Sequence, residues 1–239
     1  MVIGYNRVLS SRGPAHQGDP FHTRFQEFTM FRPTSLSLLM AVCSFTTVFA
    51  DKNASIETKL GTIGSPVVQE SFDSTLAKAM IPVKGQWKIL DGTLVAKELA
   101  ADKHAAVLNY QKKNRNSVVR FSFKLDGNTN GFNFSLNHAG GHLFRVVVAP
   151  TKISLNLDKD KKDPDSKALV MATAKGTFER GKWYTLQVEM AGKQVVAQTD
   201  NGLTVEATHD KLDTEKPNYR FVMRGESLAL DDLRIWELN

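Results

Sequence analysis

The chain has 239 residues, of which 41% are hydrophobic and 23% charged, and its formal net charge is +6. That charge is small and spread along the chain, which argues against a nucleic-acid-binding protein. The single cysteine excludes a disulfide framework, so the protein must be held together by an ordinary hydrophobic core, and its length is ample for one.

The N-terminal part of the sequence predicts a secretory signal peptide at residues 30–50. A short basic start precedes the apolar run 36–49, and Val48 and Ala50 then supply small residues at the two positions that a signal peptidase reads. The run is too short for a membrane span, and the valine before Cys43 disfavours a lipid anchor. We therefore expect a secreted or periplasmic protein of a bacterial cell envelope, with no membrane span after signal cleavage. Residues 1–29 are interpreted as a spurious or disordered extension upstream of the true start.

Residues 51–66 are polar and predict a tether, and the folded domain is predicted to span 67–239. Within it, short apolar-alternating segments are separated by turn signals such as Asp91-Gly92, a pair typical of two-residue hairpins. The predicted strands are 67–72, 86–90, 93–97, 106–110, 117–125, the two strands within 131–150, 152–157, 169–172, 183–190, 194–199, 203–208, 219–224 and 227–236. A phase change at Asp231-Asp232 predicts a bulge in the last strand. Because no long stretch shows the helical period, we predict an all-β sandwich or jelly roll forming one domain.

The central segment, 131–150, predicts a hairpin in which apolar and polar residues alternate along each strand. One face is predicted to carry Phe132, Phe134, Leu136, Phe144, Val146 and Val148, and the other Asn133, Ser135, Asn137, Leu143, Arg145 and Val147. His138 and His142 flank the turn at 139–141. Amide, hydroxyl, imidazole and guanidinium groups on one face of a hairpin indicate a polar binding site on a β scaffold.

The candidate catalytic residues are His104, His138, His142 and Lys103, which we expect the fold to gather on one side of the sandwich. Imidazole exchanges protons near neutral pH, which suits general acid and base chemistry. Three imidazoles also make a divalent metal an alternative cofactor, although no carboxylate or cysteine completes a ligand set. A third alternative is that these are loop histidines that only form hydrogen bonds.

The candidate substrate-binding residues are Arg145, Asn133, Ser135 and Asn137. Two interpretations of Arg145 stay open, because its guanidinium suits both a bound sugar or carboxylate and an acidic partner on the next strand. The loop 158–167 contains four Asp and four Lys, and its spacing does not match a helix-loop-helix calcium site. It is predicted to be a surface loop.

Four stretches of the domain form a framework that can be compared with known folds. They are WKILDGTLVAKE, FSFKLDGNTNGFNFSLNHAGGHLFRVVV, GKWYTLQVEMAGKQVVAQTDNG and RGESLALDDLRIWEL. Together they resemble the concanavalin A-like jelly rolls, and within them the bacterial secreted 3-keto-disaccharide hydrolase domain family, which is family-16 glycoside hydrolase-like. The resemblance covers residues 67–238. It implies a two-sheet jelly-roll sandwich with a concave sugar-facing sheet.

The resemblance implies a secreted glycan-active protein that hydrolyses a modified (3-keto) disaccharide or a related glycoside. Its partner is expected to be a glycan or small sugar. One departure bears on catalysis, because the E-x-D-x-E strand of family-16 glycosidases, which carries the catalytic carboxylates, is absent from the sequence. The alternative is therefore a non-catalytic carbohydrate-binding or cell-envelope-associated module.

Overall fold

A computed structural model describes residues 55–238 of the chain. The predicted signal peptide, the extension before it, the cysteine and the first residues of the predicted tether lie outside these residues. Fifteen strands and two short 3-10 helices follow one another along the described chain. No helix in this part is long and apolar enough to cross a membrane.

The strands form two antiparallel sheets. Sheet A contains β1 (Val68–Glu70), β3 (Gln86–Leu90), β4 (Thr93–Lys97), β6 (Ser117–Asp126), β11 (Trp183–Ala191), β12 (Gln194–Thr199), β13 (Thr204–Thr208) and β15 (Ser227–Glu237). Sheet B contains β2 (Met80–Lys84), β5 (Ala106–Tyr110), β7 (Gly131–His138), β8 (Gly141–Ala149), β9 (Lys152–Leu157), β10 (Leu169–Lys175) and β14 (Tyr219–Arg224). The 3-10 helices are η1 (Ala100–Asp102) and η2 (Asp210–Leu212).

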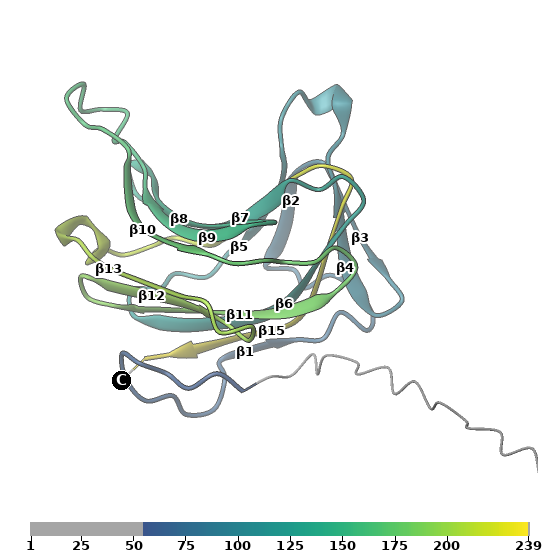
Figure 1. Cartoon of the computed structure of the whole chain (residues 1–239), viewed down its shortest axis with the longest axis horizontal. Coiled ribbons are helices and arrows are strands. Elements are labelled where there is room, and N and C mark those ends of the chain that lie inside the picture. The colour runs from purple at the N-terminus through teal and green to yellow at the C-terminus, as the bar shows by residue number, and fades with distance from the viewer. Residues whose placement is uncertain (1–54, 239) are drawn as a thin grey trace, which may run out of the picture. The chain divides into compact units, whose positions relative to one another are not determined.

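The two sheets lie face to face as the layers of a sandwich (Figure 1). Sheet A has the order β13-β12-β11-β6-β15-β4-β3, with β1 also paired to β15, and sheet B has the order β10-β9-β8-β7-β14-β5-β2. Neighbours in a sheet are often distant in sequence, as where β14 lies between β5 and β7. The predicted all-β, two-sheet sandwich is confirmed.

The core between the sheets is built from the alternating residues of each strand. On β6 the inward residue Phe121 has its ring centroid 6.0 Å from that of Phe132, 5.6 Å from Phe134 and 5.2 Å from Phe221. These rings join the central strand of sheet A to β7 and β14 of sheet B, and all of them are buried. Because side chains alternate along a strand, burying the phenylalanines of β7 turns Asn133, together with the other polar residues of that strand, to the outer face.

The predicted hairpin is present, but its second strand departs from strict alternation. Leu143, predicted to share a face with Arg145, is only 4% exposed and belongs to the core. The register explains this, because Leu136 pairs with Phe144 while Asn137 pairs with His142, which leaves Leu143 as the extra residue of a bulge. The bulge therefore places His142 beside Asn137.

A second bulge lies where the sequence predicts one. The pairing of β15 with β6 shifts between Asp231 and Arg234, and Asp232 adopts a positive φ of 48°. This break allows Leu230 and Leu233, which differ in phase, both to lie in the core.

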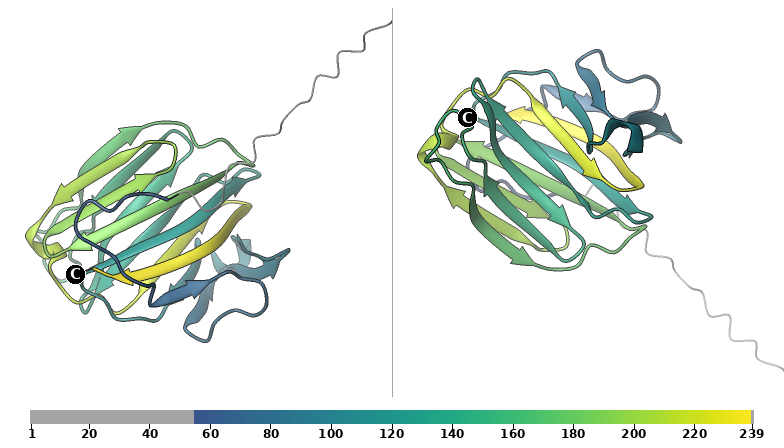
Figure 2. Two further views of the ribbon diagram at one scale, coloured as in Figure 1. Left: turned by 90° about the horizontal axis from the view of Figure 1, so that it is seen from below. Right: turned by 90° about the horizontal axis from the view of Figure 1, so that it is seen from above.

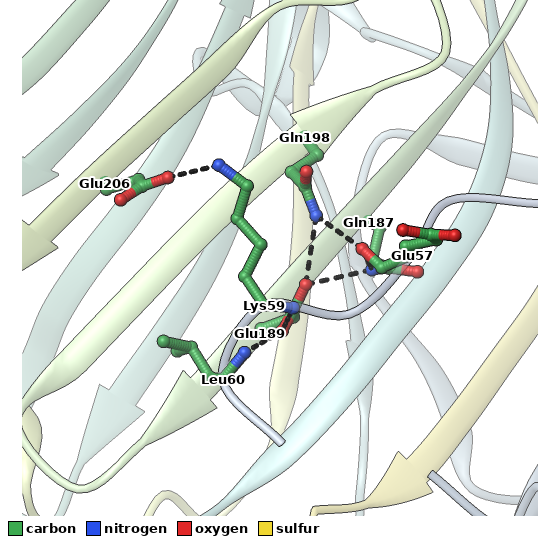
Figure 3. A network of polar contacts seen from close by, with 7 residues as sticks. All are labelled: Glu57, Lys59, Leu60, Gln187, Glu189, Gln198 and Glu206. Atoms are coloured by element: carbon green, nitrogen blue, oxygen red, sulfur yellow. Dashed lines mark hydrogen bonds and ion pairs between the residues drawn. The ribbon is translucent and has the colours of Figure 1, made fainter. Parts of the chain in front are cut away.

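The described part of the predicted tether does not extend away from the domain. Residues 55–66, which we call the strap, run along the outer face of sheet A (Figure 1, and Figure 2, left). Figure 3 shows the contacts that hold them. Oε2 of Glu189 accepts hydrogen bonds from the backbone nitrogens of Lys59 and Leu60, each at 2.8 Å. Oε1 of Glu189 accepts from the side-chain amides of Gln187 at 2.9 Å and Gln198 at 3.1 Å.

Further contacts fix the start of the strap. Both glutamine amides also donate to the carbonyl oxygen of Glu57, at 3.3 and 2.9 Å, and Arg120 donates to the carbonyl oxygen of Ile56 at 2.7 Å. The Lys59 ammonium pairs with Glu206 at 2.5 Å. The strap therefore occupies this part of the outer face of sheet A, whereas no segment of residues 55–238 runs in the same way across the outer face of sheet B.

Candidate functional site

The outer face of sheet B lies on the inner side of that sheet's curve, with the β9–β10 loop rising at one end and the loop that contains η1 at the other (Figure 1). Cross-strand partners point to the same side of a sheet, so the register defines which side chains lie side by side. One line of partners crosses the five strands β5, β14, β7, β8 and β9. It consists of Asn109, Arg220, Ser135, Arg145 and Asn156, and we call it the polar row.

The polar row has the length of a short oligosaccharide, because five strands at about 4.8 Å spacing span roughly 19 Å. The next outward-facing line is more apolar. It consists of Val107, Val222, Asn133, Val147 and Ser154, of which Val107 and Ser154 are buried and the middle three are partly exposed. Two parallel lines, one of hydrogen-bonding groups and one of mostly aliphatic groups, match a ligand with both hydroxyl and C–H surfaces.

The two asparagines at the ends of the polar row have unused hydrogen-bonding capacity. The side-chain oxygens of Asn109 and Asn156 are buried and have no hydrogen-bond partner. A buried acceptor left without a donor costs roughly 1–3 kcal/mol. Neither oxygen is exposed to solvent, so a ligand hydroxyl can donate to it only when the asparagine amide turns outward, and such a bond would remove that cost.

The charged residues in the strands of sheet B are all basic. None of the seven strands of sheet B contains Asp or Glu. The nearest carboxylate, Asp158, directly follows β9 and receives hydrogen bonds from Nε of Arg145 at 3.1 Å and from its Nη2. The interpretation of Arg145 as the partner of an acidic residue is thus confirmed, and the remaining nitrogen of its guanidinium, Nη1, makes no bond within residues 55–238.

Arg220 differs from Arg145 in lacking a counter-ion. It is half-buried, and its guanidinium makes no hydrogen bond or ion pair within the described chain. Desolvation lowers the pKa of its guanidinium, and the positive charge of Arg145 lowers it further. The two arginines flank Ser135 on either side and are close enough to repel each other.

A cavity of about 400 Å³ lies at the turn end of the β7–β8 hairpin, and we call it the hairpin pocket. It is lined by the turn and by residues of the loop after β9, among them Asn137, His138, His142, Arg145, Asp158 and Lys161. A second cavity, of about 300 Å³, shares both histidines and Asp158 and is closed by residues of η2 and the segment that follows it. The hairpin thus presents both of its histidines to solvent-accessible space.

Hydrogen bonds orient the histidines of the hairpin pocket. Nδ1 of His142 lies 2.9 Å from Oδ1 of Asn137, whose amide nitrogen donates to Asn218 at 3.3 Å. Since Asn137 offers an acceptor oxygen, His142 carries its proton on Nδ1 and leaves Nε2 as an acceptor when neutral. Nδ1 of His138 accepts a hydrogen bond from the backbone nitrogen of Gly140 at 3.4 Å.

The pKa of His142 is lowered from its ordinary value of 6.5, mainly because its ring is partly desolvated. The positive charges of Arg220, Arg145 and Lys161 lower it further, while Asp158 opposes them. The ring is therefore neutral at physiological pH, with one donor and one acceptor nitrogen.

The structure does not bring His104 and Lys103 to this pocket, so the predicted cluster of three histidines and a lysine is wrong. Ala106 lies in register with Met223 and Phe132 at one end of sheet B, whereas His138 is six residues further along β7, roughly 20 Å away. His104 precedes Ala106 and lies further still in the same direction. The loop fixes it there, because Nδ1 of His104 contacts the carbonyl oxygen of Ala105 at 2.8 Å.

The metal alternative loses its three-imidazole basis for the same reason. In residues 55–238, no group of three or more His, Cys, Asp or Glu side chains is placed to hold a metal ion. Lys103 ends η1 with a positive φ of 48° and is exposed.

The predicted substrate-binding residues do share a surface, since Asn133, Ser135, Asn137 and Arg145 all lie on the outer face of sheet B. The sequence interpretation missed Arg220, Asn109 and Asn156. The alternation within 219–224 does indicate that Arg220 faces away from the core. No local pattern indicates that its strand lies between β5 and β7.

No protein-family model matches the sequence, and no curated protein matches it either. Solved structures do share its fold. The carbohydrate-binding module CBM66 from Bacillus subtilis matches with a TM-score of 0.55 at 11% identity, over 66% of this chain and 96% of that one. SCLam, a non-specific endo-β-1,3(4)-glucanase from family GH16, matches with a TM-score of 0.54 at 12% identity, over 74% of this chain and 94% of that one.

A third similar structure is a GlcNAcα1-4Gal-releasing endo-β-galactosidase from Clostridium perfringens. It matches with a TM-score of 0.55 at 11% identity, over 78% of this chain and 64% of that one. Identities this low establish architecture and carry no activity with them. The predicted concanavalin A-like jelly roll is therefore confirmed as the fold, which this chain shares with carbohydrate-binding modules and family-16 glucanases.

Proposed function

We propose that this chain is a glycan-binding protein of the bacterial cell envelope that holds an oligosaccharide on the outer face of sheet B. The observation that carries the proposal is the polar row, whose two end asparagines, Asn109 and Asn156, hold buried acceptor oxygens without partners that a ligand reaches when the amides turn outward. Sugar hydroxyls are the donors that fit such acceptors, and Val147 and Val222 offer contact to the C–H face of a sugar ring. The similar fold of a carbohydrate-binding module supports the same assignment.

Binding without turnover is favoured over glycoside hydrolysis by the absence of acidic residues from the strands of sheet B. Glycosidases of the family-16 type require two carboxylates on either side of the scissile bond. On this face the nearest carboxylate belongs to Asp158, and it is engaged by Arg145. A pair of catalytic carboxylates thus has no position among the strand residues of this face.

The second candidate is hydrolysis of a modified (3-keto) disaccharide in the hairpin pocket. His142 favours it, because a neutral imidazole oriented by Asn137 beside a cavity of about 400 Å³ suits proton transfer. In this mechanism Nε2 of His142 takes a proton from the attacking water, and His138 gives a proton to the oxygen of the leaving sugar as the glycosidic bond breaks, while Asn137 and Arg145 hold the substrate. His104 and Lys103 take no part, because they lie at the other end of the sheet.

A glycan panel scored for both binding and product release tests these candidates together. It should contain neutral glucans and galactans, their acidic counterparts, and 3-keto disaccharides. We expect binding that N109A and N156A each weaken about tenfold, while H142A leaves it nearly unchanged. K88Q, an exposed change on sheet A, serves as the control. Release of a monosaccharide that H142A abolishes would establish the hydrolase instead, and a panel with neither binding nor turnover would refute both.

Export from the cytoplasm is part of the same proposal, because the glycans of the cell envelope lie outside the cytoplasm. The mass of the protein recovered from its native source is expected to correspond to cleavage after Ala50. A mature N-terminus well before that residue, or a lipid on Cys43, would contradict it.

A further inference from the structure

The distribution of charge between the two sheets is uneven. Every carboxylate in a strand of the described chain belongs to sheet A, and they are Glu70, Asp126, Glu189, Glu206, Asp231, Asp232 and Glu237. The strands of sheet B contain only basic charges, and they are Lys84, Arg145, Lys152, Lys175, Arg220 and Arg224. The strand residues of sheet B therefore contribute only positive charge to its surface, and carboxylates from the adjoining loops offset part of it at Lys84 and Arg145.

Arg220 is the residue of this face that is best placed to bind an anion. It stands in the polar row between Asn109 and Ser135, half-buried, and has no ion pair within residues 55–238. A partly buried cation without a counter-ion costs free energy that a bound anion recovers. Its planar guanidinium binds carboxylate or sulfate oxygens through two parallel hydrogen bonds.

Arg145 adds a second, weaker contribution at the far side of Ser135. Its Nε and Nη2 are taken by Asp158, which cancels most of its charge and holds the guanidinium in place. Its Nη1 stays available as a directed donor. Arginines two strands apart are separated by about 10 Å at their backbones, so an anionic group above Ser135 is within reach of both side chains.

The two ends of the polar row hold unpaired acceptors, the side-chain oxygens of Asn109 and Asn156, which can accept from a ligand once their amides turn outward. A simple anion supplies no donors, and a neutral sugar supplies no negative charge. A sugar that carries a carboxylate or a sulfate supplies both.

We infer that the ligand of the polar row is an acidic glycan, whose anionic group lies above Ser135 on Arg220 and Nη1 of Arg145 and whose hydroxyls donate to Asn109 and Asn156. This inference rests on the proposed glycan-binding function and narrows it to one chemical class. The shared chemistry is an anionic group on a sugar ring, with uronic acids and sulfated sugars as its two sources.

The test compares each acidic ligand with a neutral form that differs from it only at the anionic group. The full chain is titrated with a galacturonic acid tetrasaccharide and its methyl ester, and with a sulfated galactan tetrasaccharide and its desulfated form, at low and at physiological salt. We expect at least one of the two acidic ligands to bind ten times more tightly than its neutral form and to weaken with salt. The arm that binds identifies the source of the negative charge.

Variants assign the effect to Arg220. R220Q is expected to weaken binding of the acidic ligand about tenfold and to leave binding of its neutral form unchanged, and R220K is expected to recover part of the loss. K88Q removes the same charge from the outer part of sheet A and should change neither affinity by more than twofold. Thermal unfolding of each variant shows that the domain stays folded.

The outcomes separate this inference from the function on which it rests. If the ester or other neutral glycans bind as tightly as both acids, or if R220Q has no effect on the acid, the acidic class is wrong while glycan binding stands. If no glycan of either kind binds, the proposed function fails, and this inference fails with it.

Discussion

Truncating Glu189 to alanine is expected to release the strap from sheet A. Glu189 is fully buried, and its two carboxylate oxygens accept four hydrogen bonds, two from backbone nitrogens of the strap and two from glutamine amides of the sheet. Within residues 55–238, Glu189 is the side chain that accepts from all four of these donors, as Figure 3 shows. The substitution therefore affects the strap and the outer face of sheet A at once.

The magnitude follows from what each donor does afterwards. The backbone nitrogens of Lys59 and Leu60 regain water once the strap lifts, whereas the amides of Gln187 and Gln198 lose both Glu189 and the Glu57 carbonyl. Hydrogen bonds to a charged acceptor contribute about 1.5–3 kcal/mol each, and rehydration returns part of that. A net loss of about 3–5 kcal/mol is expected, which lowers the melting temperature of a domain of this size by on the order of 10 °C.

Two measurements check this expectation. Circular dichroism gives the free energy of unfolding, and limited trypsin digestion reports cleavage after Lys59, which should become fast in E189A well below its melting temperature. E206Q is the matched control, because the ion pair of Glu206 with Lys59 is exposed and worth about 0–1 kcal/mol. A loss below about 1 kcal/mol in E189A, or unchanged cleavage after Lys59, would refute the assignment of Glu189 as the anchor of the strap.

Two further predictions concern the hairpin pocket and the core. The imidazole of His142 should titrate below pH 6.5 by NMR, and R220Q should raise its pKa, because Arg220 is one of the charges that lower it. A lowered pKa means that, near this pH, the folded state binds fewer protons than the unfolded state. The contribution of His142 to stability is therefore complete above about pH 6.5 and is lost as the pH falls through the folded pKa. A measured pKa at or above 6.5 would contradict this direction. F121A should lower the free energy of unfolding by about 3–5 kcal/mol in denaturant titrations, because the ring contacts three other phenylalanines, and a loss below about 1 kcal/mol would show that it does not centre the core.

Local alternation in the sequence is sufficient to determine which way most side chains face. The phenylalanines of 117–125 and 131–138 recur every second residue, and burying them commits the residues between them, Ser135 among them, to the outer face. The phase change at Asp231-Asp232 indicates its bulge in the same way. The bulge at Leu143 escapes such analysis, because an apolar residue fits either face of a pattern that is read from one strand alone.

Which strands become neighbours is decided only by the tertiary structure. Pairing between strands is a long-range choice, set by how two sheets bury their apolar faces against each other, and the period of a single strand contains no information about it. That choice places Arg220 beside Ser135, although 85 residues separate them in sequence, and sends His104 to the opposite end of the sheet from His138. The tertiary structure also decides the position of the strap, because the buried carboxylate of Glu189 accepts hydrogen bonds from its backbone nitrogens. In the sequence alone, the same polar segment has no visible partner and therefore resembles a free tether.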